Sequence, residues 1–461
     1  MNFNSLTQSH IESLRDMVAA DRFSMGESVL NLHAKDQSPH PPSRPEVVIW
    51  PTTASEVAEI LKYANANRIA VTGWGSGSSL EGNPIPTARG IVLDFSQMNR
   101  ILNIREEDFQ ADVEPGVVYQ DLNDKLKYKG LFFPPDPGAR ATVGGMIANN
   151  AAGTRTIYYG STKDYVLRLS VVLASGEIIE LGTRASKTSS GYDLIRLFVG
   201  SEGTLGVVVG ATVRLVGLPV EFSAAIATFP TIDAAGKAVF EIMRTGLNPA
   251  ALELLGPECI DLMNKEDKLQ LDVSPTLFME FHGATTRQLA EILEMAEEIC
   301  REQEYQKFQP GLGRKERDRL FKARHGLGEM IIRNHPDCGV LIMDVAVPIT
   351  AYSELIAAIR NEMTATDLVS YYISHAGNGN VHLNIVGQKD DPQKWDLINE
   401  ITHRLVAKSL DLGGTATGEH GIGLGKRKYM VAEHGSSLEW MRRVKSLFDP
   451  RGILNPGKIF P

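Results

Sequence analysis

The sequence contains little cysteine: Cys259, Cys300 and Cys338 are the only three in 461 residues. Thiols so widely separated form neither a disulfide framework nor the four-cysteine spacing of an iron–sulfur cluster. Redox chemistry in this chain would therefore require a bound organic cofactor or another metal. No stretch approaches the ~18 uninterrupted apolar residues of a membrane span, and the N-terminus lacks the apolar core of a signal peptide. We therefore expect a cytoplasmic protein with no transmembrane segment.

The chain also has fewer basic than acidic residues. The chain has 47 Lys and Arg against 56 Asp and Glu, which gives a formal net charge of −9. The longest basic run is "GKRKY" at 425–429. A chain of this charge predicts no nucleic-acid partner.

The pattern of apolar runs changes near residue 216. Before it, short strand-like runs alternate with glycine-rich turns, and the strand–helix–strand order of 45–75 predicts a parallel pair of strands joined by a helical crossover. After it, glycine becomes sparser and long helical patterns alternate with apolar strands. We therefore predict an α+β chain with a first domain, a second α+β domain and a C-terminal segment, over residues 1–215, 216–413 and 414–461.

Two histidines flank an Asn-Gly pair in "ISHAGNGNVHLNI" at 373–385. Asn378-Gly379 predicts a two-residue type I′ hairpin, because both central residues of that turn need positive φ. His375 would then lie directly opposite His382, with Cβ atoms about 4.5–5.5 Å apart. Two rings at that distance can reach one metal ion. The alternative is a pair of ordinary half-buried histidines, and a third ligand would distinguish the two.

A candidate third ligand occurs in "TATGEHGIGLGK" at 415–426, where Glu419 and His420 stand among four glycines. So many glycines give a backbone too flexible to serve packing alone. A mobile surface loop is the alternative interpretation.

Three glycine-rich loops occur in the first domain, at 72–83, 136–153 and 200–208. The first does not match the G-x-G-x-x-G dinucleotide fingerprint. Glycine and serine can still form nests of backbone N–H groups around a pyrophosphate. Any one loop can be a tight turn, but three in one domain favour a large phosphate-containing cofactor.

A set of motifs, in chain order from about residue 45 to the C-terminus, resembles the FAD-dependent D-2-hydroxy-acid dehydrogenases. This family includes FAD-linked D-lactate dehydrogenases, the glycolate oxidase flavin subunit and D-2-hydroxyglutarate dehydrogenases. The motifs are "PTTASEVAEIL", "GWGSGSSLEG", "DPGARATVGGMIANNAAG", "VVLASGEIIELG", "GSEGTLGVV", "HAGNGNVHLN", "GEHGIGLGK" and "FDPRGILNPGKIF". The D-lactate dehydrogenase branch is favoured by "ARATVGGMIANNAAGTRTIYYG" and "KARHGL".

The resemblance implies a vanillyl-alcohol-oxidase-type FAD-binding domain, a substrate-binding cap domain and a C-terminal helical tail that returns to the FAD domain. Some relatives attach flavin through a histidine in the first loop. This chain has Trp74 and no histidine there, so we expect non-covalent FAD. The residues implied to bind it are Gly73, Gly75, Ser76, Gly77, Ser78, Pro135, Thr142, Gly145, Asn149, Glu202, Val208 and Asn455.

The resemblance also implies a catalytic set. His375, His382 and Glu419 match the family ligands of one divalent metal, for which zinc, manganese and iron all remain open. His420 matches the general base, and Arg324 matches the arginine that grips the substrate carboxylate. Asn384 would be a hydrogen-bonding neighbour of the substrate.

These roles predict FAD- and metal-dependent oxidation of a small D-2-hydroxy acid, with D-lactate to pyruvate favoured. After Arg324 the next cationic side chain is Arg333, so we predict no second anchor for a dicarboxylic acid on that helix or on the strand that follows. Glycolate oxidase flavin subunit, D-2-hydroxyglutarate dehydrogenase and a sugar-type oxidase are the enzymatic alternatives, and a hydroxy-acid sensor is the non-enzymatic one. Quinone, a cytochrome and an electron-transfer flavoprotein all remain possible electron acceptors.

Overall fold

The fold is described from a computed structural model, which covers residues 3–461 apart from the side chains of Leu312, Glu316 and Leu320. Contacts divide the chain into two compact units. Unit 1 consists of Met1–Ala152, Ser161–Leu218 and Glu419–Pro461, and unit 2 consists of Gly153–Gly160 and Pro219–Gly418. The predicted domain limits, after residues 215 and 413, stay a prediction. Nothing in the sequence indicated that the segment Gly153–Gly160 would pack with unit 2.

The first sheet of unit 1 contains the predicted strand–helix–strand segment. Helix α3 (Ala54–Asn67) connects β2 (Val47–Ile49) to β3 (Val71–Trp74). The two strands are parallel, as expected, but they do not pair with each other. Strand β4 (Ile91–Asp94) lies between them and pairs in parallel with both, and β1 (Phe23–Ser24) completes the order β1-β2-β4-β3. The predicted pairing was therefore wrong, because a strand that is later in sequence inserts between the two.

The second sheet of unit 1 is antiparallel, in the order β5-β6-β10-β8-β9. Its strands are β5 (Ile101–Arg105), β6 (Gln110–Val113), β8 (Val166–Val172), β9 (Ile178–Gly182) and β10 (Val207–Arg214). The other elements of unit 1 are α1 (Gln8–Arg15), α2 (Glu27–Leu32), α4 (Tyr119–Leu126), β7 (Leu131–Phe132), α5 (Val143–Asn149), α7 (Ile195–Phe198), β11 (Val216–Gly217), α14 (Met430–His434) and α15 (Ser437–Phe448).

The C-terminal tail packs into unit 1 beside the strand that precedes the first glycine-rich loop. Leu454 forms a parallel bridge with Val71 of β3. The Asn455 side-chain amide donates to the backbone carbonyls of Asn83 (3.0 Å) and Glu202 (2.7 Å). One asparagine therefore joins the tail to two of the segments that carry the loops.

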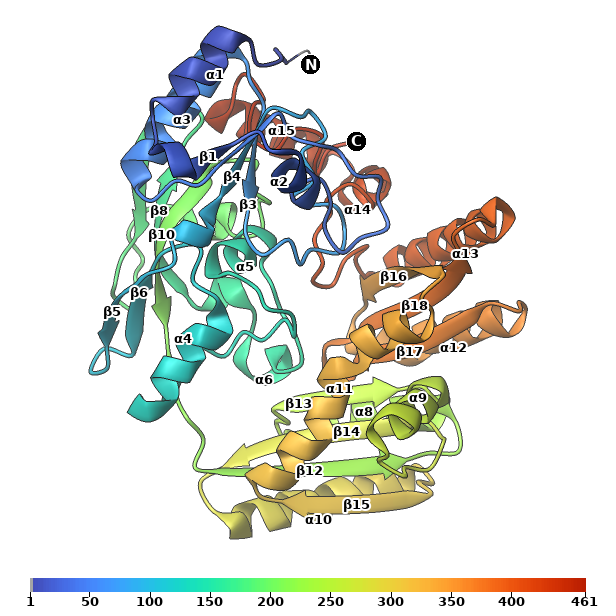
Figure 1. Cartoon of the computed structure of the whole chain (residues 1–461). Helices are drawn as coiled ribbons and strands as arrows, with labels where there is room; N and C mark the ends of the chain where they lie inside the picture. Colours follow the sequence, from blue (N-terminus) through green and yellow to red (C-terminus); the bar gives the residue numbers. More distant parts are fainter. Residues whose placement is uncertain (1–2) are drawn as a thin grey trace. The chain divides into compact units, whose positions relative to one another are not determined.

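Unit 2 is built on one antiparallel sheet of seven strands, in the order β15-β12-β14-β13-β17-β18-β16 (Figure 1). The strands are β12 (Glu221–Thr228), β13 (Ala251–Leu255), β14 (Thr276–Gly283), β15 (Lys307–Leu312), β16 (Cys338–Ala346), β17 (Val369–His375) and β18 (Asn380–Gln388). The helices are α6 (Thr156–Tyr159), α8 (Ile232–Arg244), α9 (Pro257–Asp267), α10 (Thr286–Glu302), α11 (Arg314–Asn334), α12 (Tyr352–Thr364) and α13 (Pro392–Asp411).

Helices α9 and α11 cover one face of this sheet. Phe321 and Leu327 of α11 pack with Ile260 of α9 in a buried cluster that also contains Phe278 and Ile373 of the sheet. Residues two apart on a strand share a face. The same face therefore carries the odd-numbered side chains of β17 and their partners on β13 and β18.

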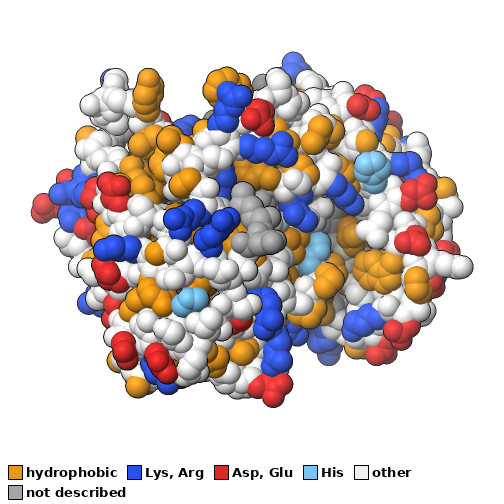
Figure 2. Space-filling model, turned by 90° about the horizontal axis from the view of Figure 1, so that it is seen from above, with side chains coloured by type: hydrophobic (Ala, Val, Ile, Leu, Met, Phe, Trp, Pro, Cys, Tyr) orange, Lys and Arg blue, Asp and Glu red, His pale blue; other side chains and the backbone are white. Residues whose placement is uncertain are grey.

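The surface carries charges of both signs. Figure 2 shows Lys and Arg side chains interspersed with Asp and Glu over one face. Among the described residues, no helix combines the length and apolar character needed to cross a bilayer.

Candidate active site

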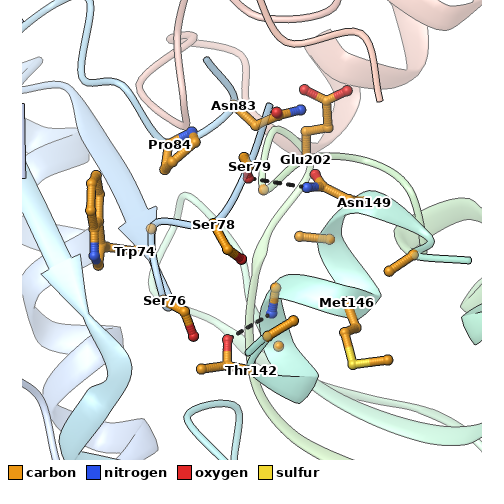
Figure 3. A pocket seen from close by; sticks show the side chains of 18 of the residues that line it. Trp74, Ser76, Ser78, Ser79, Asn83, Pro84, Thr142, Met146, Asn149 and Glu202 are labelled. Carbon is orange, nitrogen blue, oxygen red and sulfur yellow. Dashed lines mark hydrogen bonds between the residues drawn. The ribbon is translucent and has the colours of Figure 1, made fainter. Parts of the chain in front are cut away.

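Unit 1 contains a large pocket between the glycine-rich loops (Figure 3). The loop that carries Ser76 and Ser78 lies on one side, and helix α5, which carries Met146 and Asn149, lies on the other. The Asn149 amide reaches across to the Ser79 hydroxyl at 3.4 Å. The third loop completes the wall, so all three loops surround one cavity.

Two glycines show why the first loop has this composition. A Cβ on Gly75 would lie 2.4 Å from Oγ1 of Thr142, and one on Gly77 would lie 2.6 Å from the Trp74 ring. Gly77 also has φ of +64°, which favours glycine. Thr142 in turn caps α5 by accepting from the N–H of Gly145 (3.3 Å). Close packing within the pocket wall therefore requires glycine at both positions. A cavity lined by so many glycine and serine residues fits a phosphate-containing cofactor such as FAD.

The structure brings most of the predicted cofactor residues together. Pro135 is the exception: it is buried outside the lining, and Pro137 lines the pocket instead. Contact of the others with FAD stays a prediction. The predicted residues in the lining are Gly73, Gly75, Ser76, Gly77, Ser78, Thr142, Gly145, Asn149, Glu202, Val208 and Asn455.

The Glu202 carboxylate holds the loop that carries the predicted general base. It accepts hydrogen bonds from the backbone N–H of Ile422 (2.6 Å) and of Gly423 (2.9 Å). Burial raises the pKa of Glu202, and these N–H bonds oppose that rise. The loop so held places Glu419 and His420 in the wall of the same pocket. Sequence reasoning placed Glu202 among the FAD-binding residues and missed this anchoring contact.

In unit 2, the histidine hairpin has a different register from the predicted one. Ala376–Asn378 form a 3₁₀ turn and Gly379 is left-handed (φ +66°), so the connection has four residues rather than two. His375 therefore pairs with Asn380, and His382 pairs with Ile373. The type I′ turn was wrong because Asn378 enters a helical turn. The observed pairing differs from the predicted one by two residues. Because an even shift keeps each side chain on the same face of the sheet, both histidines still share one face.

The two imidazoles and Glu419 form a group that could hold a metal ion. One ligand atom from each of the three residues lies within 4.8 Å of the other two. Both histidines are buried, with 7% and 6% exposure. Glu419 follows Gly418, whose Cα lies so close to Asn380 of unit 2 that a Cβ would meet its amide nitrogen at 2.1 Å. Two imidazoles and one carboxylate fit a divalent ion with open positions, although metal binding stays a prediction.

A fully buried carboxylate that sequence reasoning missed lies behind His375. Glu253 of β13 has no exposed surface. Its Oε1 lies 2.7 Å from Nδ1 of His375, and its Oε2 accepts from Nε (2.9 Å) and Nη2 (2.7 Å) of Arg324. Burial alone would raise the pKa of Glu253, but the charges of His375 and Arg324 outweigh burial and the net pKa is lowered. Arg324 is thus a buried side chain of α11 and not a surface arginine.

A second buried carboxylate, Asp344 of β16, lies near His382. Its Oδ1 accepts from the Asn380 amide at 2.7 Å and lies 3.7 Å from Nδ1 of His382. Its Oδ2 accepts from the Thr417 hydroxyl at 2.8 Å, two residues before Glu419. Asn384, the predicted substrate neighbour, is buried on β18 two residues beyond His382 and on the same face.

A further charged cluster surrounds Glu280 of β14. His282 Nε2 lies 2.5 Å from the Glu280 carboxylate, and Nε atoms of Arg155 and Arg317 lie 3.5 and 3.9 Å from it. Arg317 is seven residues before Arg324, two turns earlier on α11, so both arginines face the sheet. The predicted absence of a second anchor concerned only residues after Arg324, so it did not include Arg317.

Two family models match the chain. Residues 45–182 match an FAD binding domain, and residues 218–459 match the C-terminal domain of FAD linked oxidases. The second match spans more than half of the chain. The chain therefore belongs to the FAD-linked oxidase family, as its motifs indicated.

Curated relatives match over almost the whole length. A probable mitochondrial D-lactate dehydrogenase of Danio rerio is 36% identical, covering 97% of this chain and 91% of that protein. Glycolate oxidase subunit GlcD of Bacillus subtilis is 34% identical, covering 99% and 97%. A D-lactate dehydrogenase of Archaeoglobus fulgidus is 36% identical, covering 90% and 91%.

Solved structures confirm the predicted fold class. The chain is similar to 4-ethylphenol oxidase from Gulosibacter chungangensis (TM-score 0.78, 19% identity, 100% of this chain and 99% of that one). It is also similar to p-cresol methylhydroxylase (TM-score 0.77, 16% identity, 99% and 98%). The fold is the vanillyl-alcohol-oxidase type with a mixed α+β C-terminal domain.

Proposed function

We propose that the protein is an FAD-dependent dehydrogenase of small D-2-hydroxy acids and that its main reaction is D-lactate to pyruvate. The observation that carries this proposal is the link through Glu253 between His375, a candidate metal ligand, and Arg324. A 2-hydroxy acid has a hydroxyl that could bind the metal ion held by His375 and a carboxylate that could bind Arg324. The names of the relatives support the same substrate class.

Each residue of the proposed site has a separate task. Arg324 holds the substrate carboxylate, because a guanidinium edge can donate two parallel hydrogen bonds to it. His420 takes the hydroxyl proton as general base. Asn384 hydrogen-bonds to the substrate and helps to orient it.

Bound FAD would supply the hydride acceptor, and a divalent ion held by His375, His382 and Glu419 would lower the pKa of the substrate hydroxyl. In the overall reaction, the 2-hydroxy acid loses its hydroxyl proton and its C2 hydride, and a 2-oxo acid forms. L-lactate should be rejected. Attachment through the carboxylate and the hydroxyl fixes two substituents of C2, so the C2–H bond can point toward the hydride acceptor in only one enantiomer.

Two other substrates have specific support. Glycolate is supported by the likeness to glycolate oxidase subunit GlcD. D-2-hydroxyglutarate is supported by Arg155 and Arg317, which are two cationic side chains besides Arg324 that a distal carboxylate could use. D-lactate remains first because Glu280 already opposes part of their charge and because the names of several relatives refer to D-lactate.

The electron acceptor is proposed to be a cytochrome, since some relatives are named D-lactate dehydrogenase (cytochrome). Quinone and an electron-transfer flavoprotein are the alternatives. Reduced protein mixed with each acceptor separately would be reoxidised fastest by the physiological type.

The test of the main proposal is the flavin colour. Anaerobic D-lactate should bleach the yellow protein with formation of one pyruvate per flavin, while L-lactate should leave the absorbance unchanged over the same time. Binding of D-lactate without bleaching would contradict an enzyme and support a hydroxy-acid sensor.

A further inference from the structure

Glu253 lies between two parts of the proposed site that have different tasks. One carboxylate oxygen faces the His375 ring, and the other faces the Nε–Nη2 edge of Arg324. All three residues are buried, with 0%, 7% and 9% exposure for Glu253, His375 and Arg324. A carboxylate buried this deeply is held between its partners and cannot turn to water.

On the histidine side, the contact decides which ring nitrogen carries the proton. Glu253 accepts at 2.7 Å, so Nδ1 of His375 must be the N–H donor. In the neutral imidazole the lone pair is then on Nε2, which is the nitrogen that would bind an ion. Carboxylate–histidine pairs of this kind orient metal ligands and raise their basicity, and their loss weakens metal affinity about 10–100-fold.

On the arginine side, the contact decides which edge of the guanidinium remains available. Glu253 uses Nε and Nη2. The second edge, made of Nη1 and the other hydrogen of Nη2, is not used by Glu253 and can pair with a carboxylate in bidentate geometry. Because the guanidinium is planar, fixing one edge fixes the direction of the other.

We propose that Glu253 is a positioning residue that sets the separation between the metal group and the carboxylate-binding edge of Arg324. This inference rests on the proposed function, in which a 2-hydroxy acid is held at both points. A single rigid bridge between them favours acids whose hydroxyl and carboxylate are on adjacent carbons. Acids with the hydroxyl one carbon further away, such as 3-hydroxybutyrate, are therefore rejected.

The chain contains a matched control for this inference. Glu280 lies on the neighbouring strand β14, is 1% exposed by its side chain, and also contacts a histidine, His282, and an arginine of α11, Arg317. Neither partner of Glu280 belongs to the metal group or to the D-lactate site. Glu280→Gln therefore removes the same charge from the same face of the sheet without touching the Glu253 bridge.

The first experiment measures Zn²⁺ and Mn²⁺ affinity of the flavin-loaded protein by competition with a chromophoric chelator. Glu253→Gln keeps the shape but cannot accept from both partners, so we expect metal affinity to fall about tenfold or more. Glu280→Gln should change it less than about twofold. Melting temperature and FAD content are recorded for each variant, so that a general loss of structure is visible.

The second experiment separates kcat from KM. Glu253→Gln should raise the KM for D-lactate about tenfold or more, since Arg324 is no longer directed, while Glu280→Gln should leave it near the wild-type value. Glu253→Asp keeps the charge but shortens the side chain by one carbon. It should fold even if Glu253→Gln does not, and it should restore part of the metal affinity while KM stays raised, because the shorter arm cannot reach both partners.

The outcomes distinguish the inference from the proposed function. If Glu253 variants bind metal and D-lactate as the wild type does, or if Glu280→Gln causes equal losses, the positioning role is wrong. A second outcome is that the wild type binds metal and the Glu253 variants bind it more weakly, but D-lactate is not oxidised. In that case the proposed function fails, while the link between Glu253 and His375 stands. A wild type that binds neither ion contradicts both.

Discussion

His375 and His382 lie diagonally across the paired strands β17 and β18, with ring centroids 5.1 Å apart and ring planes at 87°. Diagonal neighbours on one face are further apart at Cβ than directly opposed residues. The two rings nevertheless approach closely, as the distance between their centroids shows. Near-perpendicular imidazoles can direct one nitrogen each at a shared ion.

The first prediction concerns this pair. His382→Ala should remove the bound metal and reduce turnover at least a hundredfold, because two protein ligands cannot hold a hydrated divalent ion tightly. FAD should stay bound, since His382 is not part of the flavin pocket lining. Elemental analysis and the flavin absorbance measure the two effects. The exposed His403 on α13 offers a control, His403→Ala, which should retain metal and activity.

Unchanged metal content in the His382→Ala protein would place the ion elsewhere. Loss of FAD together with metal would show instead that the substitution disturbs the fold.

The sequence indicated the two histidines but not their register. The Asn-Gly signal predicts a tight turn from local conformational preference alone. In the structure, Gly379 packs against the Val347 carbonyl of the neighbouring segment, where a Cβ would lie 2.1 Å away. Tertiary contact therefore selected a four-residue turn, and local reasoning could not detect this. His375 and His382 still share one face, because the alternation of side chains along a strand does not depend on the type of turn.

The second prediction is that FAD is bound without a covalent bond. The described pocket lining contains no cysteine, and its one histidine, His420, is the proposed base. The first loop has Trp74 where some relatives carry a histidine. Acid precipitation should leave a colourless pellet and release all flavin into the supernatant. A yellow pellet after repeated washing would contradict the prediction.

Long-range pairs were the part of the site that the sequence could not supply. Glu253 lies in an apolar strand, "ALELL", 71 residues before Arg324 and 122 before His375. Nothing in that strand marks the glutamate as functional until the order β14-β13-β17 is known. One signal was available: a single acid in a run of buried apolar residues needs a partner, since an unpaired buried charge is costly. The same signal applies to Glu280 in "TLFMEFHG".

The third prediction concerns acid stability. Burial would raise the pKa of Glu280, but Arg155, His282 and Arg317 outweigh burial and lower it to about 2. The unfolded chain therefore takes up this proton first as pH falls below the ordinary value of 4.5. The stability that Glu280 contributes is complete above about pH 4.5 and is lost toward pH 2. Its size should be on the order of 2–4 kcal/mol.

Glu280→Gln should thus lower the melting temperature at pH 7 and flatten its dependence on pH between about 4.5 and 2. Thermal unfolding at several pH values measures both effects. A variant as stable as the wild type at pH 7, with the same acid sensitivity, would show that this carboxylate contributes no stability through its partners.

The fourth prediction concerns which acid is oxidised. In the proposed site Arg324 would hold the single substrate carboxylate and D-lactate adds only a methyl group, so the wild type should have its highest kcat/KM for D-lactate. D-2-hydroxybutyrate and glycolate should follow at graded, lower values, because a methylene in an apolar site changes discrimination by only about 1–3 kcal/mol. L-lactate should be rejected far more strongly. The measurement is kcat/KM for each acid with an artificial dye as electron acceptor.

The same assay tests whether Arg317 assists the binding of a dicarboxylic acid. Arg317 lies two turns before Arg324 on α11, and its Nε lies 3.9 Å from the Glu280 carboxylate, which already opposes part of the charge that a distal carboxylate would use. D-2-hydroxyglutarate should therefore be a poorer substrate than D-lactate, and Arg317→Gln should lower its kcat/KM about tenfold or more while D-lactate changes little. If instead the wild type prefers D-2-hydroxyglutarate and Arg317→Gln abolishes that preference, Arg317 is a true second anchor and the protein is a dicarboxylic-acid dehydrogenase. If the preference survives in Arg317→Gln, the anchor is another cationic residue, and Arg155→Gln is the next variant to measure.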